Sequence, residues 1–171
     1  MNAPPAEGHS AMNLSSAPGR IPGPTLRAAS VRVSRQVTAS PERIFDAWLD
    51  AGQARAFLFA DRRWDAISSK IDARVAGDFR IVRQWDGEDV EYSGQYLEID
   101  RPQRLMFSLF VEKYAHLDDR VIVELAPVAG QTLLVLTHEL SVPDPVERSR
   151  IRREWARVLE RLAALLESAR H

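Results

Sequence analysis

The chain of 171 residues has no cysteine, no long apolar run and no excess of charge of either sign. Without cysteine it has no disulfide, no thiolate ligand for a metal and no cysteine nucleophile, and it is compatible with a reducing compartment. The 23 Lys and Arg residues nearly balance the 24 Asp and Glu residues, so we expect no basic field for nucleic acid or an anionic membrane. A chain of this length is best accommodated as one domain with a single core.

The apolar runs are shorter than the ~20 residues that a membrane-spanning helix requires. The first thirty residues have neither a basic start nor an apolar stretch of the secretory type. We therefore expect a cytoplasmic protein without a membrane span, and the composition leaves a homodimer open.

The amino-terminal segment is rich in Ala, Pro, Gly and Ser and has neither helical nor strand periodicity. Such a segment buries too little apolar surface to offset chain entropy, so we predict a disordered tail at residues 1–29. From Val31 the pattern changes, because Val31, Val33 and Val37 alternate with polar residues as in a half-buried strand. A single domain is therefore predicted at residues 30–171.

Two short helices are predicted after this strand. Ser40 is a suitable N-cap and Pro41 a suitable first helical residue, and apolar residues up to Leu49 then recur at helical spacing. Asp50 can cap a second helix, which is expected to end before Asp61.

Strand-like runs follow in series, separated by turn signals such as Asp86-Gly87 and Ala129-Gly130. The runs are 64–74, 77–85, 90–99, 104–111, 120–126 and 132–140. A long final helix has an apolar face of Ile151, Trp155, Val158, Leu159, Leu162, Leu165 and Leu166. The order is β-α-α-β6-α, which predicts an α+β helix-grip fold: a curved antiparallel sheet of about seven strands gripping the C-terminal helix.

The most informative segment is 92–107, which reads as two strands in period two joined by a turn at Pro102. Its pattern is Gly94, then Tyr96-Leu97-Glu98-Ile99-Asp100, then Pro102, Leu105 and Phe107. This pattern resembles the START-like (SRPBCC) superfamily of polyketide cyclases, lipid-transfer domains and birch-pollen-allergen-like proteins. The resemblance is closest to the activator of heat-shock protein 90 ATPase homologues, in their bacterial single-domain form.

Other segments carry the same resemblance, which covers nearly all of residues 31–167. Residues 34–48 look like the opening strand and helix of the family, and residues 72–79 look like its Asp-x-Arg-Pro-Gly-Gly-x-Phe turn, with Val75 and Ala76 in place of the proline and the first glycine. Residues 132–138 resemble the last strand, and Trp155 resembles a residue of the closing helix. The resemblance independently implies the helix-grip fold.

The resemblance also implies an interior cavity, in which relatives bind apolar or aromatic molecules. We accordingly predict a hydrophobic small molecule as the partner. Strand alternation and the family pattern select inward-facing side chains for this cavity. The candidate pocket residues are Phe79, Ile81, Arg83, Trp85, Tyr92, Tyr96, Phe107, Leu109, His138 and Trp155.

Each candidate has a structural alternative. His138 can orient a ligand or act as a general base, or it can be a hydrogen-bonded core residue. Arg83 can anchor a carboxylate in the pocket, or it can be exposed or paired with Glu91 across the hairpin. The large aromatic residues can stack on a ligand or simply fill the core.

Charged segments give no further site. Asp86, Glu88 and Asp89 form an ordinary hairpin turn without the spacing of a calcium loop, so we predict no metal and no cofactor. The arginines of the last helix alternate with glutamates, which favours a solvated face at Arg150, Arg153, Arg157 and Arg161.

Three functions remain open at this point. The first is a small-molecule binding module, which the resemblance favours. The second is a cyclase-like or hydrolase-like enzyme, although the sequence has no recognisable catalytic motif and we assign no catalytic residue. The third is a protein-interaction module with a chaperone partner, which the name of the family suggests.

Overall fold

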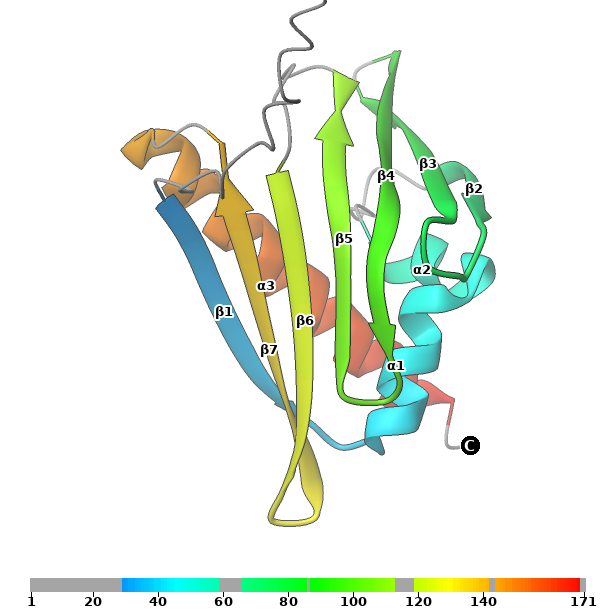
Figure 1. Ribbon diagram of the computed structural model, residues 1–171, viewed down its shortest axis with the longest axis vertical. Helices are drawn as coiled ribbons and strands as arrows, with labels where there is room; N and C mark the ends of the chain where they lie inside the picture. The colour runs from blue at the N-terminus through cyan, green and yellow to red at the C-terminus, as the bar shows by residue number, and fades with distance from the viewer. Residues whose placement is uncertain (1–28, 59–65, 86, 113–118, 142–143, 170–171) are drawn as a thin grey trace, which may run out of the picture.

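The computed structural model describes residues 29–58, 66–85, 87–112, 119–141 and 144–169, and the predicted tail lies almost wholly outside them. A single seven-stranded antiparallel sheet, in the order β1-β7-β6-β5-β4-β3-β2, curves around a long helix that crosses behind it (Figure 1). The elements are β1 Ala29–Val37, α1 Pro41–Leu49, α2 Ala51–Phe57, β2 Ala66–Ile71, β3 Asp78–Trp85, β4 Glu88–Asp100, β5 Arg104–Val111, β6 Asp119–Val128, β7 Gln131–Leu140 and α3 Pro145–Ser168. The predicted α+β helix-grip fold is confirmed.

The helices begin at the predicted residues. The side chain of Ser40 accepts a hydrogen bond from the amide of Arg43 at 3.3 Å, and that of Asp50 accepts one from Gln53 at 2.8 Å. Each bond satisfies a first-turn amide that has no partner within the helix. Helix α2 ends at Phe57, and the predicted end near residue 61 lies outside the described residues.

One predicted strand was too long. Strand β2 ends at Ile71 because the chain turns immediately afterwards, where the amide of Arg74 donates to the carbonyl of Asp72 at 2.8 Å. The turn between β6 and β7 is the predicted one, since Ala129 and Gly130 both have a positive φ, of 48° and 78°. A two-residue turn with two positive φ angles matches the twist of the strands that it joins.

The concave face of the sheet is apolar. Burial alternates residue by residue along β7, so Leu134, Leu136 and His138 point inward as the family pattern implied. The neighbouring strands β4 and β5 approach each other closely at Gly94, where a Cβ atom would lie 1.9 Å from the carbonyl oxygen of Ser108. A side chain at this position would therefore force the two strands apart.

Helices α1 and α2 cover one end of the concave face together with the C-terminal half of α3 (Figure 1). We call this region the closed end. An aromatic cluster fills it, in which Trp48 packs edge-on against Phe57 with ring centroids 5.1 Å apart and lies 6.2 Å from Phe107. Two arginines join the helices, since Arg161 donates to the carbonyl of Phe57 at 3.1 Å and Arg43 to that of Leu166 at 3.2 Å.

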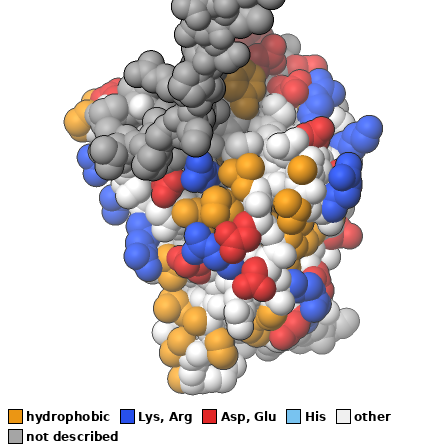
Figure 2. All heavy atoms as spheres, viewed as in Figure 1, with side chains coloured by type: hydrophobic (Ala, Val, Ile, Leu, Met, Phe, Trp, Pro, Cys, Tyr) orange, Lys and Arg blue, Asp and Glu red, His pale blue; other side chains and the backbone are white. Residues whose placement is uncertain are grey.

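The outer face of the sheet mixes charged and apolar side chains (Figure 2). Arg104 lies between Glu98 and Glu124, with ion-pair distances of 3.2 and 2.7 Å. Among the described helices, none is both long and apolar enough to cross a membrane.

Candidate functional site

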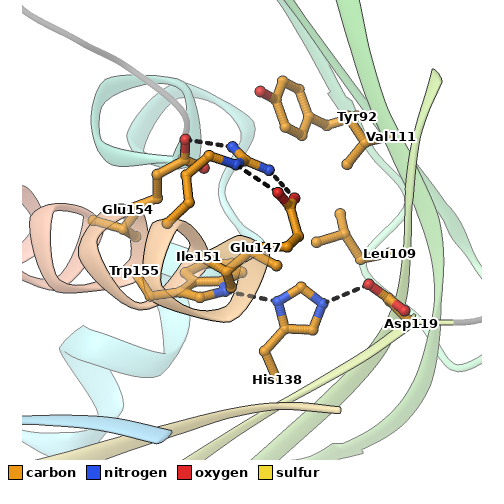
Figure 3. A pocket seen from close by; sticks show the side chains of 11 residues that line it. Tyr92, Leu109, Val111, Asp119, His138, Glu147, Ile151, Glu154 and Trp155 are labelled. Atoms are coloured by element: carbon orange, nitrogen blue, oxygen red, sulfur yellow. Dashed lines mark hydrogen bonds and ion pairs between the residues drawn. The ribbon is translucent and has the colours of Figure 1, made fainter. Parts of the chain in front are cut away.

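A cavity of about 50 Å³ lies at the other end of the concave face, beneath the first half of α3 (Figure 3). We call this region the open end. Strands β4, β5, β6 and β7 supply one side of the wall and α3 supplies the other. The lining residues are Tyr92, Leu109, Val111, Asp119, His138, Glu147, Arg150, Ile151, Glu154, Trp155 and Val158.

A buried chain of hydrogen bonds forms part of this wall. The indole Nε1 of Trp155 donates to Nδ1 of His138 at 2.9 Å, and the other ring nitrogen of His138 lies 3.1 Å from Asp119 Oδ2 (Figure 3). Because an indole N–H can only donate, Nδ1 of His138 must be the acceptor. The ring proton is therefore on Nε2, which donates a hydrogen bond to Asp119. The imidazole is thereby held in one tautomer, and both of its nitrogens are engaged.

Asp119 is the far end of this chain. Its second oxygen accepts hydrogen bonds from both the amide and the hydroxyl of Ser141, each at 2.7 Å. Burial by itself raises the pKa of Asp119, but the hydrogen bonds from His138 and Ser141 outweigh it and lower this pKa below the usual value. The carboxylate is therefore ionised and fully hydrogen-bonded in the wall of the cavity.

A second polar group lies at the rim, on the first turns of α3. The guanidinium of Arg150 binds Glu147 through two of its nitrogens and Glu154 Oε1 at 2.8 Å. The spacing of three and four residues brings these side chains together on one helix face. The sequence predicted a solvated face here, but all three side chains are only 24–39% exposed and line the cavity.

Arg83 is buried, which contradicts the exposed alternative. Its guanidinium lies 5.2 Å from the centre of the Tyr92 ring, in a cation–π arrangement, and Glu91 forms its ion pair with Arg80 at 2.6 Å. Trp85 is the last residue of β3, and its side chain lies outside the described residues.

Four other candidates do not line the open-end cavity. Phe79, Ile81, Tyr96 and Phe107 border a second cavity of about 10 Å³ beside Trp48, at the closed end. Burial raises the pKa of the Tyr96 hydroxyl, so this group stays protonated. The candidate residues are thus divided, with Tyr92, Leu109, His138 and Trp155 at the open end and Phe79, Ile81, Tyr96 and Phe107 at the closed end.

Sequence reasoning missed the charged residues of the open-end wall. Asp119 lies one position before the predicted strand 120–126, although extending the alternation of Val121 and Val123 by one step would have placed it on the inward face. Glu147, Arg150 and Glu154 carried no such signal, because a pattern of alternating charges on a helix is also typical of a surface.

Comparisons with known proteins agree with the fold. The model of the family described as activator of Hsp90 ATPase homolog 1-like protein matches residues 38–167. None of the curated proteins matches the sequence.

Several solved structures have the same fold. The protein CV1439 from Chromobacterium violaceum is 26% identical, with a TM-score of 0.73 over 81% of this chain and 96% of that one. An AHSA1-like protein from Aeromonas hydrophila is 18% identical, with a TM-score of 0.71 over 82% and 94% of the two chains. CalU16 from Micromonospora echinospora is 22% identical, with a TM-score of 0.60 over 82% and 79%.

Proposed function

The chain belongs to the activator of Hsp90 ATPase homolog 1-like family, and from this premise we propose that it binds a small apolar or aromatic molecule in the open-end cavity. The observation that carries the proposal is the wall itself. Apolar side chains from two strands and from α3 face one another there, and Trp155 forms its base. An enclosed apolar wall with a few ordered polar groups is the usual form of a small-molecule site.

A ligand of this kind needs more room than the cavity has, because about 50 Å³ holds only one or two water molecules. We expect the first turns of α3 to move outward on binding. Val146 in the first turn is 78% exposed, whereas the bonds from Arg161 and Arg43 tie the other half of α3 to the closed end.

Binding is better supported than catalysis. A general base needs a ring nitrogen that can reach the substrate, but both nitrogens of His138 are engaged by Trp155 and Asp119. The chaperone hypothesis is not favoured either, since the exposed large apolar side chains are scattered over separate segments, at Val75, Leu97, Phe110, Val128 and Val146.

Titration with N-phenyl-1-naphthylamine, an uncharged probe whose fluorescence rises in apolar surroundings, tests the proposal. We expect saturable binding that Val111→Trp weakens at least about tenfold, because the larger side chain fills the rim. Val128→Trp, at an exposed position in β6, is the matched control and should bind as wild type does. Absence of saturable binding to the wild-type protein would overturn the proposal.

Native mass spectrometry of protein purified from its own source addresses the natural ligand, since a retained molecule would give its mass directly. Turnover of that molecule, abolished by His138→Ala in a variant that is still folded, would replace the binding module with an enzyme.

A further inference from the structure

The charged groups in the wall of the open-end cavity already bind one another. Arg150 is held by Glu147 and Glu154, and Asp119 is held by His138 and Ser141. A charged ligand group that contacts this wall would have to displace the partners of Arg150 or those of Asp119, or it would be buried without a partner. Both alternatives cost free energy, because ions are strongly solvated in water.

We propose that the open-end cavity selects an uncharged ligand, and that the ion pairs of Arg150 are what excludes anions such as carboxylates. This inference rests on the proposed function and specifies the chemical class of its ligand. It differs from the alternative in which Arg83 anchors a carboxylate, because the guanidinium that lines the wall is that of Arg150, which is occupied by two glutamates of its own helix.

Charge balance in the wall points in the same direction. The wall has three carboxylates, from Asp119, Glu147 and Glu154, against the single guanidinium of Arg150. A ligand carboxylate therefore meets net repulsion at this wall. A ligand ammonium group is attracted, but it must compete with Arg150 and with the hydrogen bonds of His138 and Ser141 for the same oxygens.

Arg83 does not reverse this balance. Its guanidinium lies 5.2 Å from the centre of the Tyr92 ring, and it is the Tyr92 side chain that lines the cavity. Counting Arg83 as well leaves three carboxylates against two guanidinium groups. A neutral ligand can lie against Leu109, Val111 and Ile151 without having to pair with any of these charged groups.

Three naphthalene derivatives that share the aromatic ring system and carry one neutral, anionic or cationic substituent test the inference. They are 2-naphthylmethanol, which is neutral, 2-naphthoate, which is an anion, and 2-naphthylmethylamine, which is a cation at pH 7. Their affinities are measured by displacement of N-phenyl-1-naphthylamine. We expect the alcohol to bind at least about tenfold more tightly than either ion, with the anion weakest, and tenfold corresponds to about 1.4 kcal/mol.

The double variant Glu147→Gln, Glu154→Gln releases the guanidinium of Arg150 and identifies the cause. We expect the ratio of its affinity for 2-naphthoate to its affinity for the alcohol to rise at least about tenfold relative to wild type. Glu160→Gln is the matched control, because Glu160 is an exposed residue of the same helix that does not line the cavity. It should leave all three affinities unchanged.

The outcomes separate the two proposals. If no derivative displaces the probe and the probe itself does not bind, the proposed function fails. If the probe binds but 2-naphthoate or the amine is the tightest ligand of the wild-type protein, the binding function stands and the selection for an uncharged ligand is wrong. If the ratio of the affinity for 2-naphthoate to that for the alcohol is no higher in the double variant than in wild type, the role of the ion pairs is wrong.

Discussion

The two ends of the concave face are built differently although one helix covers both. At the closed end, aromatic rings pack at centroid distances of 5.1–6.3 Å and leave a cavity of about 10 Å³. At the open end, the wall contains two hydrogen-bonded polar groups and a cavity of about 50 Å³. Dense apolar packing is rigid, whereas the open end is held by a few directional bonds.

Trp155 joins the two ends. Its ring lies 6.4 Å from Trp48 on one side and 5.9 Å from His138 on the other. If the open end binds a ligand as proposed, substitutions at the closed end should affect stability alone. The predictions below test this separation of stability from binding.

The largest expected effect is that of Trp155→Ala, because this side chain serves both ends. Truncation of a buried tryptophan typically lowers the free energy of unfolding by ~3–5 kcal/mol, and here it also leaves Nδ1 of His138 without its donor. Urea denaturation measures the loss. A value near 1 kcal/mol would mean that Trp155 borders a much larger space than the cavity described.

Asp119→Asn should destabilise the protein by ~1–3 kcal/mol at neutral pH, since a carboxylate that accepts three hydrogen bonds is replaced by an amide that cannot accept them all. The folded pKa of Asp119 is below its unfolded value of ~3.9. Its ionised form therefore stabilises the fold above about pH 4, and this contribution is lost as the pH falls through the folded pKa.

The difference in unfolding free energy between wild type and Asp119→Asn should accordingly shrink below about pH 4. Asp46→Asn is the control, because Asp46 also has a lowered pKa but is an exposed partner of Arg101. It should change stability by less than about 1 kcal/mol at any pH. A constant difference for Asp119→Asn down to pH 2 would contradict the hydrogen-bonded carboxylate.

The same substitution at two tryptophans compares the ends directly. Trp155→Phe removes a hydrogen bond to His138, whereas the Nε1 of Trp48 has no partner among the described residues. We expect Trp155→Phe to cost about 1–2 kcal/mol more than Trp48→Phe, as measured in parallel urea melts. Equal losses would mean that the bond to His138 adds nothing to the packing of the ring.

The smallest effect is expected for Arg161→Met, which keeps the apolar stem of the side chain but loses the bond to the carbonyl of Phe57. We expect a loss of about 1 kcal/mol and no change in the affinity for N-phenyl-1-naphthylamine. Arg157→Met, at an exposed position of the same helix, is the control for the loss of charge. Weaker probe binding by Arg161→Met would show that the two ends are coupled.

Local sequence patterns were sufficient to predict the helices and strands. The N-caps at Ser40 and Asp50, the turn at Ala129-Gly130 and the apolar face of α3 are each determined by residues within a few positions of one another. The family resemblance then supplied the inward orientation of β7, which its own apolar pattern on both faces left open. The predicted tail, the location in the cell and a homodimer remain predictions.

The residues of the candidate site could be predicted from the sequence only in part. Tyr92, Leu109, His138 and Trp155 line the open-end cavity, whereas Phe79, Ile81, Tyr96 and Phe107 border the closed-end cavity. That any of them contacts a ligand stays a prediction. Alternation along a strand predicts on which face of the sheet a side chain lies. It does not predict at which end of a curved sheet the helix leaves a cavity.

What the amino-acid order by itself determined is therefore the elements, their order and the face that each one buries, because these depend on neighbours along the chain. The tertiary structure decided the partners: His138 meets Asp119 and Trp155 across 19 and 17 residues, and Arg161 meets the carbonyl of Phe57 across 104. A hydrogen bond depends on distance and direction in space, and these arise only when the sheet has curved and α3 has packed across it.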